Sequence, residues 1–175
     1  MNDLSSTHSG WLSQEFFSEA VKALPLVSVD LLVINDSKEL LLGLRRNRPA
    51  QGWWFTPGAR IRKNEPLNTA LQRVWKTELN QSVAMPSCSL LGAWDHFYDD
   101  SAFSESVSTH YVNLPHLVFT SDTLNFHKDE LPSDQHSQWN WVNIEQVSQA
   151  DVVHPYIRSY AQAILDSKSR PTGAA

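Results

Sequence analysis

The helical pattern of residues 64–79 places one carboxylate on the face that should pack against the protein core. At about 100° per residue, its apolar side chains form one stripe with Glu78 at the centre, and the stripe consists of Leu67, Ala70, Leu71 and Val74. An unpaired buried carboxylate is costly, so Glu78 should meet a cation, either a basic side chain or a metal ion. A salt bridge with Arg73, or exposure where the last turn leaves the core, is the alternative.

A basic segment precedes this helix. Between Glu39 and Glu65 there is no acidic residue, although the net charge of the chain is −5. Six of the fourteen Lys and Arg residues fall in this interval, namely Arg45, Arg46, Arg48, Arg60, Arg62 and Lys63. A small polyanion could be held here on an otherwise acidic protein. Taken alone, the cluster could equally be a solvated basic loop.

The segment "WWFTPGAR" (53–60) joins the basic segment to the helix through a Pro-Gly turn. A tight turn can offer a backbone carbonyl to a cation, while nearby N–H groups and arginines face an anion. Mg²⁺ prefers carboxylate and carbonyl oxygens, and it usually completes its coordination with water and substrate phosphates. The turn, the helix and the inward acid therefore indicate a metal–diphosphate site. The phosphate-binding patterns GxxxxGK[ST] and GxGxxG do not occur in the sequence.

Length and composition limit the class of protein. A chain of 175 residues with 41% hydrophobic residues can form one globular domain with a substantial core. Its acidic balance argues against a general nucleic-acid binder. Cys88 is the single cysteine, which excludes an internal disulfide and favours a small core residue over a reactive thiol. No apolar run approaches the roughly 18 residues of a membrane span, so we expect a soluble, cytoplasmic protein with no membrane contact.

Periodicity predicts one mixed α/β domain over residues 13–168, with flexible ends at 1–12 and 169–175. Strands are predicted at 26–34, 39–45, 89–98, 109–120 and 138–144, and helices at 13–24, from Asn64 or Glu65 onward, and within 154–168. Asn64 is the expected N-cap of the middle helix, with Pro66 in its first turn. The Ser-rich connection 101–108 should be mobile.

Residues 59–81, "ARIRKNEPLNTALQRVWKTELNQ", resemble a degenerate Nudix box, whose usual form is G-x5-E-x7-R-E-U-x-E-E-x-G-U with U an aliphatic residue. The positions that match are Glu65, Arg73 and Glu78, and those that differ are Ala59, Val74, Thr77 and Asn80. Thr77 and Val74 stand where ordinary Nudix hydrolases carry acids. A cluster of several metal ions that promotes attack on phosphorus is therefore disfavoured.

Over residues 13–160 the chain is similar to one Nudix branch, the GDP-mannose mannosyl hydrolases. The segments that carry the similarity are "PLVSVD" (25–30), residues 41–60, "WDHFYDD" (94–100), "THYV" (109–112) and "LPSDQH" (131–136). Their order and spacing are compatible with this branch. The resemblance implies an α/β fold, the Nudix-type α/β/α sandwich with a mixed β-sheet, and a homodimer. It also implies a GDP-sugar substrate and Mg²⁺ as the cofactor, with Mn²⁺ as a substitute.

The resemblance further implies a role for each matching position. The metal ligands would be the Gly58 carbonyl, Glu78 and Gln135, with the diphosphate completing the shell. The phosphates and the leaving group would be held by Arg45, Arg60 and Tyr111, while Asp30 and His96 would orient the sugar or neighbouring polar groups. His136 would be the general base, and Arg73 would orient Glu78 and support the loop.

These roles are compatible with hydrolysis at the sugar carbon C1. A loop histidine with an ordinary pKa near ~6.5 can activate water at neutral pH. Because GDP leaves as a stable anion that Mg²⁺ and arginine neutralise, one base is enough, and attack from the opposite face predicts inversion. The products would be GDP and free mannose, with GDP-glucose as a second substrate. Two alternatives stay open: an ordinary Nudix pyrophosphohydrolase that cleaves P–O–P, and a non-catalytic nucleotide-sugar sensor.

The Ala59 and Asn80 positions leave one conformational question. Glycine at these places could serve a close backbone approach or a positive φ. If φ at Ala59 is negative, alanine costs little there, whereas a positive φ would strain the loop and weaken metal binding. The loss of both glycines is the best argument for a sensor, and the retention of Gln135 and His136 is the argument against it.

Overall fold

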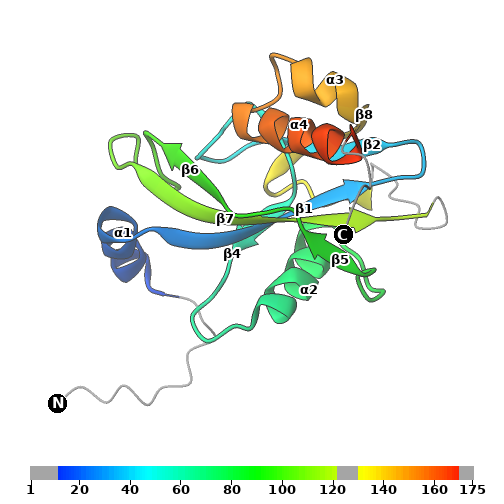
Figure 1. Cartoon of the computed structure of the whole chain (residues 1–175). Coiled ribbons are helices and arrows are strands. Elements are labelled where there is room, and N and C mark those ends of the chain that lie inside the picture. Colours follow the sequence, from blue (N-terminus) through cyan, green and yellow to red (C-terminus); the bar gives the residue numbers. More distant parts are fainter. Residues whose placement is uncertain (1–11, 122–129, 170–175) are drawn as a thin grey trace, which may run out of the picture.

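The computed structural model describes residues 12–121 and 130–169, and its centre is a mixed, eight-stranded sheet (Figure 1). The strand order along the main path is β3-β2-β1-β7-β5, with β4 paired to β1, β6 to β7 and β8 to β2. Strands β1 and β7 run parallel, whereas the other pairs are antiparallel. Because a parallel pair needs a long crossover connection, helices lie over the faces of this sheet.

The elements follow the order α1-β1-β2-β3-β4-α2-β5-β6-β7-β8-α3-α4. The strands are β1 (Leu26–Ile34), β2 (Glu39–Arg45), β3 (Trp54–Phe55), β4 (Gly58–Arg60), β5 (Cys88–Leu90), β6 (Trp94–Tyr98), β7 (Thr109–Phe119) and β8 (His136–Asn143). The helices are α1 (Gln14–Ala23), α2 (Leu67–Glu78), α3 (Ile144–Gln149) and α4 (Pro155–Ser169). None of the helices in residues 12–121 and 130–169 is long and apolar enough to span a membrane.

The side chains of β1 pack alternately into two hydrophobic cores, one on each face of the sheet. Val29, Leu31 and Val33 pack with α2, while Leu32 and Ile34 pack with α3 and α4. Figure 1 shows α2 on one side of the sheet and α3 and α4 on the other. The predicted α/β/α sandwich with a mixed sheet is confirmed, since a strand buried on both faces needs a covering layer on each.

Two details of the predicted elements are wrong. Helix α2 begins at Leu67 with Pro66 as its N-cap, not at Asn64, because Asn64 has a left-handed backbone with φ 62° that cannot open a right-handed helix. The single strand expected at 89–98 is two strands, β5 and β6, which separate at residues 91–93 and both pair with β7. The predicted flexible ends, 1–12 and 169–175, lie almost wholly outside the described residues and stay predictions, as do the domain bounds 13–168.

Candidate active site

A cavity of about 400 Å³ opens at the end of the sheet where β1 and β4 meet the basic segment. Its walls also include α1, the connection between β6 and β7, and the residue before β8. Most of the predicted site residues line it, namely Asp30, Arg45, Gly58, Arg60, Arg73, His96, Tyr111 and Gln135. Glu78 and His136 are not in the lining and lie behind it. Residues that are far apart in sequence thus line one cavity.

Strands β1 and β4 set the floor of this cavity through a very close backbone approach. Asp30 pairs with Gly58 in the antiparallel register. A Cβ atom on Gly58 would lie 2.2 Å from Asp30 Oδ1 and 2.7 Å from the Val29 carbonyl oxygen, so no other residue fits without movement. The same pairing places Gly58 in the cavity lining beside the Asp30 carboxylate.

Asp30 is held in a buried hydrogen-bond network. Its Oδ2 accepts a bond of 2.6 Å from the Asn113 side chain and one of 3.4 Å from the Tyr160 hydroxyl. Burial, opposed mainly by the Asn113 bond, raises the pKa of Asp30 to about 7. The sequence interpretation missed Asn113 and Tyr160, because nothing in their local spacing distinguishes them from core residues of β7 and α4.

His96 belongs to the same network. Its Nε2 lies 2.7 Å from the Tyr160 hydroxyl, and its ring stacks on Tyr156 with a centroid distance of 3.9 Å. Burial lowers the pKa of His96 to about 3, so the ring is neutral at physiological pH. Two strands and helix α4 therefore fix His96 and Asp30 relative to each other, through Tyr160.

Gln135, which lines the cavity, contacts Glu78, which does not. The Gln135 amide Nε2 donates a hydrogen bond of 2.8 Å to Glu78 Oε1. Glu78 is buried, as the helical pattern predicted, and burial raises its pKa to about 7, opposed chiefly by the charge of Arg45. No ion pair of Glu78 occurs within the described residues, so the predicted salt bridge with Arg73 is absent there.

Arg73 has a different partner from the one expected. Its guanidinium donates to both carboxylate oxygens of Glu65, at 2.6 and 2.8 Å, and to the carbonyl of Arg60 at 2.9 Å. The hydrogen bond from Arg73 lowers the pKa of Glu65. Because these contacts occupy its guanidinium, Arg73 supports the loop that carries Arg60, and it does not orient Glu78 by direct contact. The loop-supporting half of the expectation agrees with this geometry.

His136 does not lie in a loop, and its pKa is not the ordinary one. It is the first residue of β8, is 1% exposed, and packs against Trp139 with a ring distance of 4.5 Å. Gly43 makes room for it, since a Cβ there would lie 2.5 Å from the imidazole. Burial first, and then the charge of Arg45, lower the pKa of His136 to about 3. Its Nε2 is buried without a hydrogen-bond partner, which is uncommon in a folded protein and needs a reason.

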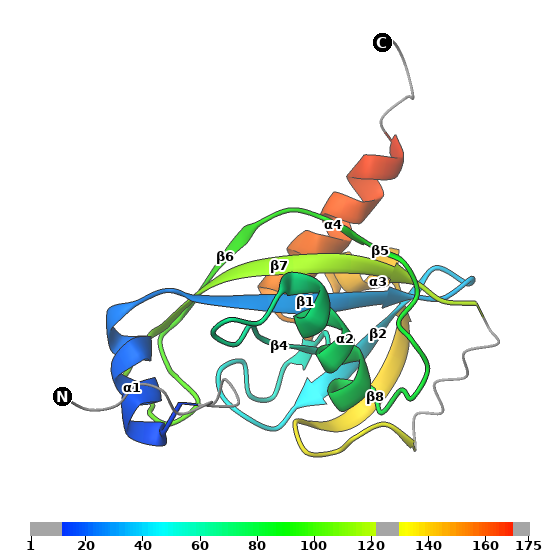
Figure 2. The ribbon, with the colours of Figure 1, turned by 90° about the horizontal axis from the view of Figure 1, so that it is seen from below.

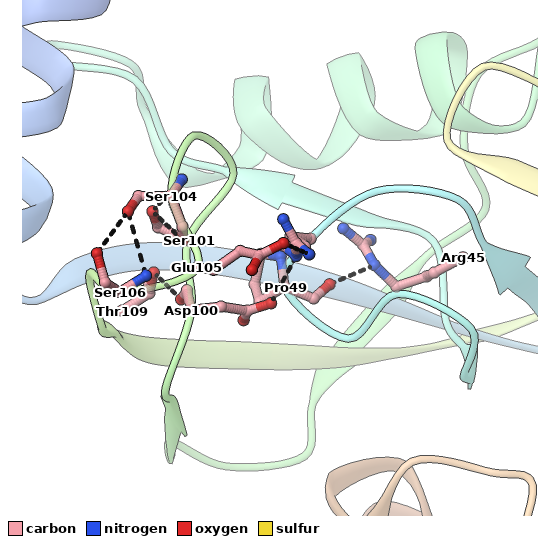
Figure 3. A network of polar contacts seen from close by, with 9 residues as sticks. Arg45, Pro49, Asp100, Ser101, Ser104, Glu105, Ser106 and Thr109 are labelled. Carbon is pink, nitrogen blue, oxygen red and sulfur yellow. Dashed lines mark hydrogen bonds and ion pairs between the residues drawn. The ribbon is translucent and has the colours of Figure 1, made fainter.

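Arg45 is held by a polar network in which Arg48 and Pro49 also line the cavity (Figure 3). Its Nε donates a bond of 3.0 Å to the Pro49 carbonyl. The adjacent Arg48 pairs with Asp100 at 3.4 Å and with Glu105, which joins the basic segment to the connection between β6 and β7. That connection, which was expected to be mobile, also contains turn hydrogen bonds between Ser101 and Ser104. The Thr109 hydroxyl donates a hydrogen bond of 2.8 Å to the Asp100 carbonyl.

Arg60 and Tyr111 lie on neighbouring parts of the cavity wall. Burial lowers the pKa of the Arg60 guanidinium, which nevertheless stays charged. Burial raises the pKa of Tyr111, and the charges of Arg60 and Arg45 oppose that shift. Two arginines and a neutral phenol thus offer hydrogen-bond donors to an anion in the cavity.

Glu78, Gln135 and Gly58 offer a set of ligands that suits a single hard cation. Within residues 12–121 and 130–169, no group of three or more His, Cys, Asp or Glu side chains could hold a metal ion. The combination of Glu78, the Gln135 amide and the Gly58 carbonyl is a different kind of set, with oxygen ligands and one carboxylate. Mg²⁺ accepts such a set when phosphates and water complete its shell. Glu78, buried and without an ion-pair partner in the described chain, fits this group.

The two lost glycines of the box behave differently. Ala59 lies in β4 and is not among the non-glycine residues of the described chain with positive φ, so alanine costs little there. Asn80 does have positive φ, 52°, and asparagine is the side chain that tolerates this conformation best after glycine. Neither replacement therefore places a residue in a backbone conformation that it cannot adopt.

The fold and the site together define a Nudix hydrolase. The NUDIX domain family matches residues 24–163, and the chain belongs to this family. The low-salt glycan biosynthesis protein Agl8 of Haloferax volcanii is 40% identical over 148 residues, which cover 83% of this chain and 86% of that protein.

Solved structures give the same fold. The MutT protein of Methanosarcina mazei Go1 has a TM-score of 0.67 at 18% identity, covering 83% of this chain and 97% of its own. The NUDIX domain of Shewanella oneidensis NrtR, in complex with ADP ribose, has a TM-score of 0.58 at 20% identity, covering 89% and 99%. At these identities the likeness concerns the fold alone.

Proposed function

We propose that this protein hydrolyses GDP-mannose, and GDP-glucose as a second substrate, to GDP and the free sugar by attack of water at C1. One observation carries the proposal: helix α2 presents Glu78 as its single acid. Val74 has no ligand atom and is fully buried in the core, and Thr77 is exposed and has no carboxylate. The two positions that carry acids in ordinary Nudix boxes therefore supply no acidic ligand here. A single metal ion can stabilise a diphosphate that leaves from C1, whereas attack on phosphorus in a multi-metal site needs further acidic ligands.

The cavity walls supply the contacts for the substrate. Arg45, Arg60 and Tyr111 bind the diphosphate, and Asp30 and His96 orient the sugar through their shared network. Glu78, Gln135 and the Gly58 carbonyl would hold Mg²⁺ (or Mn²⁺), whose positive charge would stabilise the diphosphate as a leaving group. Because Asp30, Arg60 and His136 lie on strands β1, β4 and β8, these side chains need little reorganisation when the substrate binds.

His136 is the proposed general base. In the tautomer that carries its hydrogen on Nδ1, the neutral ring has a lone pair on Nε2, which is buried and has no described partner. The attacking water must reach this atom from the cavity, beside Gln135, for Nε2 to take the proton. The water oxygen bonds to C1, its proton passes to Nε2, and the C1–O bond breaks with its electron pair leaving on GDP. Attack opposite to GDP inverts the configuration at C1.

A pKa of about 3 makes His136 a weak base in the free protein, and the bound substrate offsets part of this weakness. The charge of Arg45 is one cause of the low pKa. A diphosphate bound against Arg45 compensates that charge, which lets the imidazole accept a proton more readily. The base is therefore strengthened in the complex that needs it.

The similarity to Agl8 supports a nucleotide-sugar substrate, because a protein of glycan biosynthesis is named for a process that consumes activated sugars. The substrate class, the homodimer and the cytoplasmic location belong to the same proposal, with no nucleic acid or membrane as a partner. Light scattering of the purified protein at several concentrations tests the dimer.

The direct test of the reaction is incubation with GDP-mannose and Mg²⁺ in ¹⁸O-labelled water, followed by mass spectrometry. Label in free mannose, with unlabelled GDP, would establish attack at C1. Label in GMP or in mannose phosphate would mean cleavage of P–O–P and would overturn the proposal in favour of a pyrophosphohydrolase. Binding of GDP-mannose without any product would favour the nucleotide-sugar sensor.

A further inference from the structure

The N-terminal helix α1 reaches the cavity through one aromatic ring. Arg60 lies over the ring of Phe17, with its guanidinium carbon 3.7 Å from the ring centroid. Phe17 and Leu12 line the cavity, so α1 is part of its wall. In Figure 2, α1 stands beyond the end of the sheet, beside the start of β1. A helix that lies outside the residues of the Nudix box therefore contacts a cavity arginine directly.

The stacking geometry leaves the charge of Arg60 available. In the described chain Arg60 forms no ion pair, and Arg73 contacts its carbonyl oxygen, not its guanidinium. An aromatic face attracts a guanidinium without using its N–H donors, which point outward in the guanidinium plane. The Phe17 ring restricts the guanidinium from one side, and the N–H groups of Arg60 have no described acceptor, so they can bind an anion.

Phe17 is itself held from a second side. Its ring makes an edge contact with Phe103 of the connection between β6 and β7, at a centroid distance of 6.0 Å. The neighbouring Phe16 is 72% exposed and makes no described ring contact. Two adjacent phenylalanines on one helix thus differ sharply in their surroundings, and packing of α1 alone does not require the ring at position 17 to lie under an arginine.

We propose that Phe17 is a positioning residue of the anion site, whose ring presents the edge of Arg60 to a diphosphate. The inference rests on the proposed function only in the identity of that anion. It assigns α1 a place in substrate binding, since removal of this ring would leave a long cationic side chain free to move. The expected loss is mainly one of affinity for the diphosphate, because Phe17 acts through Arg60 and has no described contact with Glu78, Gln135 or His136.

The test measures binding of inorganic pyrophosphate with Mg²⁺ by titration calorimetry. Phe17→Leu should weaken binding by about threefold to tenfold, in the range of a partly buried cation–π interaction. Phe16→Leu, the matched control on the same helix, should stay within about twofold of the parent, since an exposed ring contributes little. Phe17→Tyr keeps the aromatic face and should restore the parent affinity. In an Arg60→Ala background, Phe17→Leu should cause no further loss.

The outcomes separate this inference from the proposed reaction. Equal losses from Phe17→Leu with and without Arg60, a failure of Phe17→Tyr to restore affinity, or parent affinity in Phe17→Leu would each overturn it. Circular dichroism of each variant shows whether α1 is retained, and Phe17→Tyr covers the case in which the leucine variant unfolds the helix. Pyrophosphate affinity that depends on Phe17, in a protein that does not hydrolyse GDP-mannose, would support the inference while the reaction proposal fails.

Discussion

The amide of Gln135 donates a hydrogen bond of 2.8 Å to the carboxylate of Glu78, although 57 residues separate them in the sequence. This contact brings the end of helix α2 against the residue before β8. It is the only side-chain hydrogen bond of Glu78 within the described residues. Burial keeps this carboxyl group partly protonated near neutral pH. The pair joins the two candidate metal ligands that come from different layers of the fold.

Glu78→Gln should stabilise the metal-free protein at alkaline pH and abolish stabilisation by Mg²⁺. The pKa of Glu78 is raised by burial from 4.5 to about 7, so the folded state holds a proton in this interval that the unfolded state has lost. Stability due to Glu78 is therefore present below about pH 4.5 and falls as pH rises toward 7. At pH 8 the variant should gain up to about 3 kcal/mol in the free energy of unfolding.

Thermal unfolding with and without Mg²⁺ at pH 8 checks this expectation. The parent should unfold at a higher temperature with Mg²⁺, and Glu78→Gln should show no shift. Glu145→Gln, an exposed position on α3, is the control and should behave like the parent. A full Mg²⁺ response in Glu78→Gln would remove Glu78 from the ligand set.

His136→Ala should lower the turnover of GDP-mannose about 100-fold or more, with little change in substrate affinity. Arg60→Ala should damage both, because an arginine that binds the diphosphate acts in the ground state and in the transition state. His136→Asn keeps more of the side-chain volume beside Gly43 and distinguishes loss of the base from loss of packing. Steady-state kinetics measures the turnover, and binding of the product GDP measures the affinity of the site. Turnover of His136→Ala equal to that of the parent would exclude His136 as the base.

Gly58→Ala should destabilise the fold and the site together. The new methyl group would meet Asp30 Oδ1 and the backbone oxygen of Val29, and a backbone atom cannot move away cheaply. We expect a loss of about 2–3 kcal/mol in unfolding free energy, as for overpacking in a core. Gly52→Ala is the control: with φ of 81° and open space around it, the cost should be about 1 kcal/mol of backbone strain. Urea unfolding of both variants measures the difference.

His154→Gln should make the protein less sensitive to mild acid. Burial, and then the charges of Arg45 and Arg158, lower the pKa of His154 to about 4. The unfolded chain binds a proton below about pH 6.5 and the folded chain does not, so this contribution to stability is present above pH 6.5 and is lost as pH falls toward 4. Between pH 6.5 and 5 the variant should lose about 1 kcal/mol less than the parent, after allowance for the partial exposure of the ring. Urea unfolding at both pH values tests this, and parallel losses in the two proteins would contradict it.

Local periodicity predicted the long elements and missed the short ones. The helices at 13–24 and 154–168, and strands β1, β2 and β7, extend over enough residues for a pattern to repeat. Strands β3 and β4 have two and three residues, too few to show any period, and α3 has six. They form because long-range partners complete their backbone hydrogen bonds, as between β4 and β1.

The sequence by itself determined that Glu78 faces inward, because the direction of a side chain on a helix depends only on its spacing from the apolar stripe. It also determined the basic segment, and through the resemblance it indicated which residues would share a site. Only the tertiary structure decided that Arg73 pairs with Glu65, and that Tyr160 and Asn113 hold Asp30. It also decided that His136 is a buried strand residue with a low pKa. Desolvation and pairing across a sheet depend on which distant segments come together, and a single position in the sequence does not carry that information.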